Sequence, residues 1–330
     1  MNEQEEQMQW EVQLCKNLQA LFTCTGGDAK GLVIKGATAS QQHGLVLISG
    51  SYTDTLDSST STGIYNYTNN SVRKGPDMKV GRFNHASVTL PNGDVAVFGG
   101  FNRNTNPTEL SLCEVFNVKS NSFAEIGNMT ETRNRPAAVL LPSGLVLIIG
   151  GYGFKSLNSC EFYNPTDKTF SASKATMSVA RAGHTASLLP DGKVLVCGGN
   201  DENDCLQTTE IYDPTTDSFS VGPLMTVKRS SHTATTLVDG RILLTGGEGH
   251  YASEIYDPKT NCFSSGPELI VKRFCHFSAL LPDGRVFIGG GYDNKSKHTT
   301  EIYDPETNSF TRGRATLLIS RRDAASASPF

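Results

Sequence analysis

The sequence predicts an all-β protein built as a β-propeller of six blades, each a sheet of four antiparallel strands. The first observation behind this prediction is a repeated pair of glycines, which the first copy shows as Gly-Ser. The copies are Gly50-Ser51, Gly99-Gly100, Gly150-Gly151, Gly198-Gly199, Gly246-Gly247 and Gly290-Gly291. Their spacing is about 50 residues, and units of that length with strand-type sequences are typical of propeller blades.

The second observation is a turn followed by an aromatic residue, repeated in the second half of each unit. The five regular copies span residues 117–123, 164–170, 213–219, 257–263 and 304–310, and residues 66–72 are a degenerate first copy. The third is composition, because 32 glycines in 330 residues and 19% charged residues suit turn-rich β structure. A closed repeat fold buries one continuous core, so we expect one propeller domain over residues 36–330 after a leader of residues 1–35.

The turn residues at which each strand ends define the four strands of a unit. Strand a, residues 231–237 in one copy, is small and β-branched and ends at an Asp-Gly hairpin turn. Strand b, residues 241–245, is apolar and ends at the two glycines. Strand c, residues 254–256, ends at an Asp-Pro turn, in which proline presets φ for the bend. Strand d carries Phe263 and ends at Gly266-Pro267, which completes a four-stranded meander.

The ends of the chain do not determine which segment completes the first blade and closes the ring. Residues 320–330 match the beginning of a strand a, and closure by the C-terminus would remove the open edge of the first blade. Residues 36–41 also fit strand a of that blade, and residues 21–27 mimic a strand b, so a shortened seventh blade is the alternative. In the leader, Trp10, Leu14, Leu18 and Leu21 have helical spacing and predict a short amphipathic helix.

The repeated unit resembles the kelch repeat, whose signature is the Gly-Gly pair, a Glu-x-Tyr on strand c and a Trp on strand d. The Leu-Pro-Asp-Gly and Tyr-Asp-Pro turns look like the kelch subtype of galactose-oxidase-like propellers, over residues 44–328. One departure is that Phe replaces the Trp of strand d, at Phe123, Phe170, Phe219, Phe263 and Phe310. A planar apolar side chain is still present, so we expect the kelch propeller fold.

Charge and cysteine usage exclude several classes of function. The net charge is −4 and no Lys/Arg run exceeds two residues, so the electrostatic footprint of a nucleic-acid binder is missing. Apolar runs fall short of a membrane span, and the acidic N-terminus differs from a signal peptide, which favours a cytoplasmic protein. The eight cysteines lack Cys-x-x-Cys spacing, and we expect reduced structural thiols, no metal and no cofactor.

The meander also predicts which side chains share a face. The loops between strands b and c (b–c loops) and the d–a connections emerge on one face, and they vary between copies. Recognition residues usually lie on such loops, so we place the binding surface there. One candidate set is aromatic or basic and lies in these loops: Tyr52, Phe101, Arg103, Tyr152, Phe154, Tyr251 and Tyr292. The other consists of arginines before strand a, which could bind carboxylates or instead hold neighbouring loops: Arg82, Arg181, Arg229 and Arg273.

These observations favour a monomeric interaction scaffold or substrate-recognition module that binds a protein segment. The kelch resemblance implies partners such as cytoskeletal proteins or ubiquitin-ligase components. It also implies an alternative, a small-molecule (sugar-type) binder or kelch-fold enzyme with its site at the channel mouth. No Ser/Cys-His-Asp array or set of converging metal ligands is evident from spacing, so we propose no catalytic residue and favour the binding protein over an enzyme.

Overall fold

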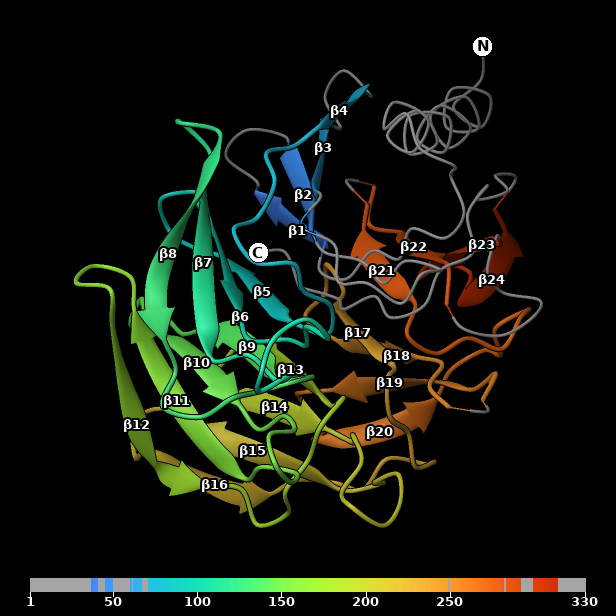
Figure 1. Ribbon diagram of the computed structural model, residues 1–330. Helices are drawn as coiled ribbons and strands as arrows, with labels where there is room; N and C mark the ends of the chain where they lie inside the picture. Colours follow the sequence, from blue (N-terminus) through green and yellow to red (C-terminus); the bar gives the residue numbers. More distant parts are fainter. Residues whose placement is uncertain are drawn as a thin grey trace.

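The strands of the computed structural model form a β-propeller, in which four-stranded antiparallel sheets are arranged around a central axis (Figure 1). The structure describes residues 37–40, 45–49, 60, 62–66, 71–248, 250–281, 283–291 and 299–313. Within these residues the chain forms strands and loops and no helix. In every sheet the four strands are neighbours in chain order, which confirms the predicted meander.

Five sheets have the regular repeat, and we number them as blades I to V along the chain. Blade I consists of β5 (Ala86–Thr89), β6 (Val95–Phe98), β7 (Leu112–Asn117) and β8 (Ser122–Asn128). Blade II consists of β9 (Ala137–Leu140), β10 (Val146–Ile149), β11 (Ser159–Asn164) and β12 (Thr169–Thr176). Blade III consists of β13 (Thr185–Leu188), β14 (Val194–Cys197), β15 (Thr209–Asp213) and β16 (Ser218–Val221).

Blade IV consists of β17 (Thr233–Thr236), β18 (Ile242–Thr245), β19 (Ser253–Asp257) and β20 (Cys262–Ser265). Blade V consists of β21 (Phe277–Leu280), β22 (Val286–Gly289), β23 (Thr300–Asp304) and β24 (Ser309–Arg312). The first strand of each blade lies innermost, and from blade I to blade V each first strand contacts that of its neighbour along the chain.

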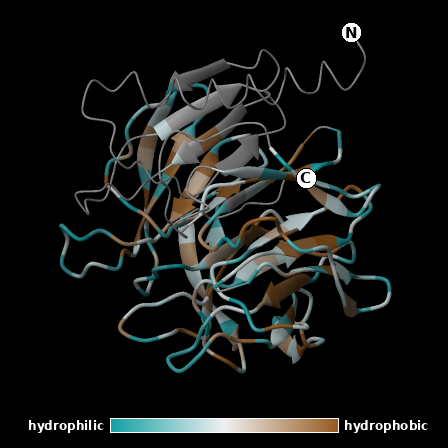
Figure 2. Cartoon of the chain, turned by 90° about the vertical axis from the view of Figure 1, so that its right-hand side faces the viewer, coloured by the Kyte–Doolittle hydropathy of each residue, from teal (hydrophilic) through white to brown (hydrophobic). Residues whose placement is uncertain are grey.

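The hydrophobic core lies between neighbouring blades. Strand b is buried along its whole length in all five blades, as its continuous apolar sequence predicts. Figure 2 shows these apolar strands running through the interior, while much of the turns and loops is hydrophilic. The phenylalanine of strand d packs on the aromatic residue of strand c, with ring centroids 5.0 Å apart for Tyr212 and Phe219. Cys113, Cys160 and Cys197 lie in these cores as free thiols.

A buried ion pair recurs in each of the five blades. It joins the arginine before strand a to the glutamate of strand c: Arg82–Glu114, Arg133–Glu161, Arg181–Glu210, Arg229–Glu254 and Arg273–Glu301. All five arginines have no exposed surface. A buried charge is tolerated only when it is paired and its remaining donors are satisfied, so these pairs are part of the core.

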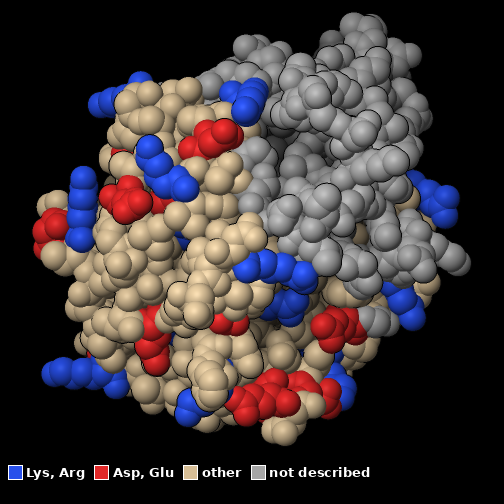
Figure 3. All heavy atoms as spheres, in the orientation of Figure 1, with Lys and Arg blue, Asp and Glu red and all other residues tan. Residues whose placement is uncertain are grey.

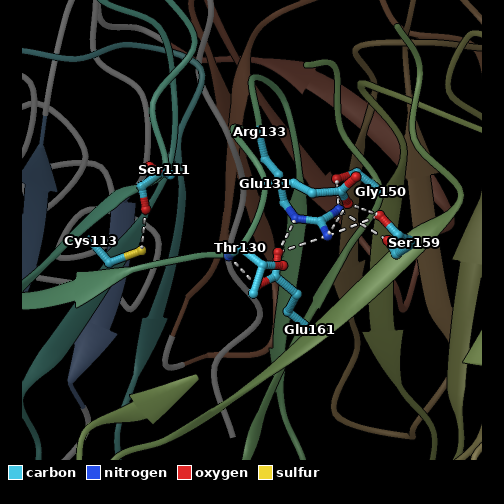
Figure 4. A network of polar contacts seen from close by, with 8 residues as sticks. All are labelled: Ser111, Cys113, Thr130, Glu131, Arg133, Gly150, Ser159 and Glu161. Atoms are coloured by element: carbon cyan, nitrogen blue, oxygen red, sulfur yellow. Dashed lines mark hydrogen bonds and ion pairs between the residues drawn. The ribbon is translucent and has the colours of Figure 1, made fainter. Parts of the chain in front are cut away.

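Arg133 shows how the pair is satisfied (Figure 4). Its guanidinium donates to Glu161 Oε1 at 2.9 and 3.0 Å, and to the carbonyl oxygens of Gly150 and Ser159 at 2.8 and 3.0 Å. The other oxygen of Glu161 accepts the backbone N–H of Thr130 at 2.6 Å. One ion pair therefore holds the d–a connection, the b–c loop and strand c of the blade together.

The predicted count of six blades, or alternatively seven, is wrong, because only five sheets carry this pair. The first copy of the unit forms a four-stranded sheet of β1 (Ala37–Ser40), β2 (Leu45–Ser49), β3 (Thr62–Asn66) and β4 (Ser71–Lys74), with β1 beside β5. In β3, however, Gly63 lies opposite Ile48, where the blades have their glutamate. This sheet therefore lacks the side chain on which each blade is built, and we count five blades.

Two further expectations concern the chain ends. The strand a of the first sheet is β1, which pairs with β2 from Ala37 opposite Ile48, and it comes from the N-terminal side. This finding replaces the proposed completion of that sheet by residues 320–330, which lie outside the described residues. The leader helix and the partial seventh blade predicted within residues 1–35 also lie outside them.

We predict that Glu254→Ala lowers the free energy of unfolding by about 3–5 kcal/mol, because it leaves the Arg229 charge buried without its partner. Urea unfolding followed by circular dichroism measures the change. Asp204→Ala is the control, since the ion pair with Lys228 and the hydrogen bond from the Cys205 N–H that it removes are both exposed, and it should cost less than about 1 kcal/mol. Equal effects of the two substitutions would show that the buried pair does not stabilise the blade.

Candidate functional site

Backbone pairing holds the b–c loops where they leave the sheet. In blades I to III, the residue after the glycine pair forms β-bridges to the segment before strand a and to its own loop. Tyr152 is an example, because it pairs with Asn134 and with Ser156. The glycines allow this close approach: a Cβ on Gly198 would lie 2.4 Å from the Arg229 carbonyl oxygen of the next blade. The loops are thus anchored where they leave the sheet, and their sequence differences lie toward their tips.

The loop of blade II presents two aromatic side chains to solvent. The N–H of Tyr152 donates to the Asn134 oxygen at 2.6 Å, and the N–H of Gly153 donates to the Lys155 oxygen at 3.0 Å. This tight turn places Phe154 at its tip with a side chain that is fully exposed, at 101%, while Tyr152 is 38% exposed. An aromatic side chain held outward on a turn is available as an anchor for a partner.

The other predicted aromatic residues differ in exposure. Tyr251, in the loop of blade IV, is 41% exposed, and the Lys272 ammonium lies 5.0 Å from its ring centroid. Phe101 is half-buried, because its ring packs on buried Phe83 with centroids 5.1 Å apart. Arg103 is exposed in the same loop as Phe101. Tyr52 and Tyr292 lie outside the described residues.

Large apolar side chains that are exposed gather toward the b–c loop face. The described residues include six of them: Tyr152, Phe154, Val221, Leu224, Val238 and Tyr251. Three lie in b–c loops, Leu224 lies in a d–a connection, and Val221 ends a strand d opposite Glu210 at the beginning of strand c. Only Val238 lies in an a–b turn on the opposite face. The sequence analysis missed Val221 and Leu224, since apolar residues in a strand or its continuation look like core.

Acidic side chains cluster on the same face between blades III and IV. Asp201 accepts the backbone N–H groups of Asn203 and Asp204 at 2.8 and 2.9 Å, and these bonds hold the pKa of Asp201 below its usual value. Asp204 pairs with Lys228. Cys205 donates to Glu248 at 3.5 Å, and burial, followed by the Glu248 charge, raises the pKa of its thiol to about 11. Figure 3 shows acidic side chains gathered where this loop lies, near the lower edge of that view.

The arginines of the second candidate set lie away from the surface. Arg82, Arg181, Arg229 and Arg273 are fully buried in the ion pairs of their blades. Their guanidinium groups contact strand c and the b–c loop of the same blade, so they act on the loops from beneath. We leave them out of the surface that a partner could touch.

Four histidines three residues after these arginines are also buried, between the innermost strands. His85 shares a hydrogen bond with Ser49 Oγ at 2.9 Å, and His276 contacts Thr233 and Thr245 Oγ1 at 2.9 and 3.0 Å. His184 lacks a hydrogen bond of normal geometry within the described residues. The place that Thr245 occupies beside His276 is taken beside His184 by Ile149 at the end of β10.

Burial fixes the charge state of these histidines. It lowers the pKa of His184 to about 3, and the charge of Arg181 acts in the same direction. The pKa of His276 is lowered to about 3 for the same reason, with Arg273 and Arg229 adding to the effect. Both imidazoles are therefore neutral at physiological pH, and both are buried.

The described residues do not fit a metal centre. No three His, Cys, Asp or Glu side chains among them converge in a way that could hold an ion. The histidines sit in separate inter-blade positions, and the tyrosines of strand c pack against phenylalanines. The same part of the chain contains no helix of the length and apolarity needed to cross a membrane.

Comparisons with known proteins agree with this architecture. The Kelch motif family matches residues 181–226 and 273–314, which cover blade III and blade V with their preceding arginines. A solved structure of a novel fungal alcohol oxidase of the AA5 family, in complex with copper, is similar with a TM-score of 0.67. The match has 19% sequence identity and covers 89% of this chain and 67% of the oxidase. A search of curated proteins found no match.

We predict that the protein loses stability as the pH falls from about 8 to about 5. The unfolded chain binds protons near the ordinary histidine pKa of 6.5, whereas folded His184 and His276 stay neutral down to about 3. Protonation therefore favours the unfolded state below pH 6.5, by about 2 kcal/mol per histidine at pH 5. Urea unfolding at both pH values measures this loss.

The substitution His184→Leu should remove part of this acid sensitivity. His250→Gln is the matched control, because His250 is only half-buried and should leave most of the pH dependence in place. If His184→Leu and the unaltered protein lose the same free energy between the two pH values, the neutral state of His184 does not contribute.

Proposed function

Because the chain is a kelch-repeat β-propeller, we propose that its b–c loop face binds a segment of a partner protein, so that it serves as an interaction scaffold or substrate-recognition module. The observation that carries this proposal is the gathering of exposed apolar side chains on one face. Five of the six large apolar side chains exposed among the described residues lie there, with Phe154 at the tip of a tight turn. A few residues carry most of the binding energy of a protein interface, and aromatic side chains such as tyrosine are enriched among them.

The construction of the loops supports recognition. Their bases are hydrogen-bonded to neighbouring segments and held from beneath by the buried ion pairs, so little order remains to be gained on binding. A preorganised surface loses less entropy when a partner docks. Loop tips that differ from blade to blade then give a surface without internal symmetry, which suits one orientation of one segment.

Charge on this face indicates the chemistry of the segment. The aromatic side of the surface is formed by the loop of blade II, and the acidic side by Asp201, Asp204 and Glu248 of blades III and IV. A segment with an apolar anchor for Phe154 and Tyr152, and with Lys or Arg toward the acidic side, complements both. Such complementarity sets the orientation and the association rate more than the affinity.

The alternative, a small-molecule binder or enzyme at the channel mouth, has the likeness to a copper-containing oxidase in its favour. At 19% identity that likeness concerns the fold. The described residues offer neither a convergent donor set for copper nor an exposed arginine ring, since histidines and arginines are enclosed between or within blades. We therefore favour the protein-binding function.

We predict that the triple substitution Tyr152→Ser, Phe154→Ser and Tyr251→Ser weakens binding of a partner segment by at least about 2 kcal/mol. Peptides selected from a phage-displayed random library against the unaltered protein are the probe, and calorimetric titration of each is the measurement. The melting temperature should change little, because these side chains lie outside the inter-blade core.

Lys119→Ala, on an exposed c–d turn of the opposite face, is the control and should leave these affinities unchanged. If every selected peptide binds the triple variant as tightly as the unaltered protein, the b–c loop face is not the binding surface.

A further inference from the structure

A groove lies on the face opposite the b–c loops, between blades III and IV. Its volume is about 680 Å³. The walls come from strands c and d of blade III, from the a–b turns of both blades and from the c–d turn of blade IV, with Ile211, Ser220, Arg241, Tyr256, Lys259 and Asn261 among the lining residues. The groove is separate from the surface proposed above.

The corresponding junction between blades II and III is crossed by the chain itself. Strand β12 is eight residues long, and its pairing with β11 is shifted by a bulge. Its Ser173 hydroxyl donates to Asp217 Oδ1 at 2.7 Å, and the backbone N–H of Lys174 donates to Asp217 Oδ2 at 3.1 Å. An extended segment thus lies against the c–d turn of the next blade. It donates hydrogen bonds to Asp217, the residue of that turn with a left-handed backbone conformation.

The junction between blades III and IV lacks this crossing segment because β16 is only four residues long. The strand ends at Val221, and Gly222 turns the chain back toward Thr209, to whose oxygen its N–H donates at 3.0 Å. A side chain could not take the place of this glycine, since a Cβ would lie 2.4 Å from Thr209 Oγ1. The short strand leaves open the space that β12 fills in the preceding junction.

Asn261 occupies in this open junction the position that Asp217 has in the closed one. Both follow the Asp-Pro turn and have positive φ, 53° and 46°. Each accepts the hydroxyl of the strand c tyrosine, Tyr256 or Tyr212, at 2.9 Å. The Asn261 side chain forms no second hydrogen bond within the described residues, so its two amide hydrogens and one lone pair are directed to solvent.

A primary amide complements a peptide group, because it can donate to a backbone oxygen and accept a backbone N–H together. The groove wall fits an extended chain as well: Ile211 and Ser220 are paired across β15 and β16, so their side chains share one face. At the rim, Arg241 is paired with Asp239 at 2.7 Å and Lys193 with Asp213 at 3.4 Å. Two carboxylates of the lining, Asp191 and Asp257, accept the backbone N–H groups of Lys193 and Lys259. The Lys259 ammonium has no ion-pair partner among the described residues and is available for an acidic side chain.

We propose that this groove is a second binding site, which takes an extended segment of another protein with an acidic side chain directed to Lys259. The bound segment occupies between blades III and IV the place that Ser173 and Lys174 occupy between blades II and III. Its backbone bonds to the amide of Asn261 and its side chains lie on Ile211 and Ser220.

Two synthetic heptapeptides test the site, both acetylated and amidated. One has the sequence of residues 170–176, Phe-Ser-Ala-Ser-Lys-Ala-Thr, which fills the closed junction. The other carries Glu in place of its Lys. Each is titrated into the full chain and followed by ligand-observed NMR, because we expect weak binding, with a dissociation constant of about 1 mM.

The glutamate peptide should bind saturably and more tightly than the lysine peptide. Asn261→Gly keeps the positive φ accessible but removes the amide. It should weaken binding of the glutamate peptide at least about fivefold, because the hydrogen bonds to that amide are lost. Lys259→Ala should abolish the difference between the peptides. Lys119→Ala, at the matching position of blade I, is the control and should leave both affinities unchanged.

The absence of saturable binding by either peptide, or equal binding by the Asn261→Gly variant, would overturn the proposal. The triple substitution in the b–c loops separates this site from the one proposed above. It should leave binding of the heptapeptide unchanged, and loss of that binding would place the peptide on the loop face and so also overturn the groove.

Discussion

The buried Arg–Glu pair is the interaction on which each blade depends. Its guanidinium binds the carbonyl oxygens at both ends of the b–c loop, and its carboxylate binds the N–H groups of the d–a connection, as for Arg82 and Glu114. The backbone oxygen of the arginine also accepts the N–H of the second glycine of the preceding blade. The distance from Gly199 N to Arg229 O, for example, is 2.9 Å. Loss of one pair therefore affects two blades, because the same residue holds its own loop and the glycine pair of its neighbour.

Most of the residue types that could form a catalytic or binding site serve the fold in this arrangement. The arginines before strand a and the histidines three residues after them recur in the sequence as if they formed a site. The structure encloses these arginines in ion pairs and these histidines between blades, and Cys113, Cys160 and Cys197 are core thiols. Burial removes these groups from water, and it holds His184 and His276 neutral. What remains for recognition is the part of each unit that the fold leaves unconstrained, namely the loop tips and the spaces between outer strands.

The sequence predicts the unit of this fold well, because glycine pairs, Asp-Gly turns and Asp-Pro turns each have one backbone solution. It does not predict the number of equivalent blades, since a degenerate copy with Gly63 in place of glutamate still reads as strands. Exposure of the arginines was open at that level too, although their occurrence in the same copies as the glutamates was a signal of pairing. The exposed position of Phe154 depends on the tight turn around Gly153, which the loop sequence alone does not reveal.

The difference between open and closed junctions has a similar origin and depends on the length of strand d. Between the strand d phenylalanine and the methionine that follows it, blade II has one more residue than blade III, from Phe170 to Met177 against Phe219 to Met225. In blade II the pairing of β12 with β11 also contains a bulge, and β12 extends across the junction to Asp217. Blade III has Gly222-Pro223 instead, and proline cannot donate the N–H through which Lys174 binds Asp217. A repeat protein can thus make one of its junctions a binding groove by shortening a strand, without altering the ion pairs that hold the blades.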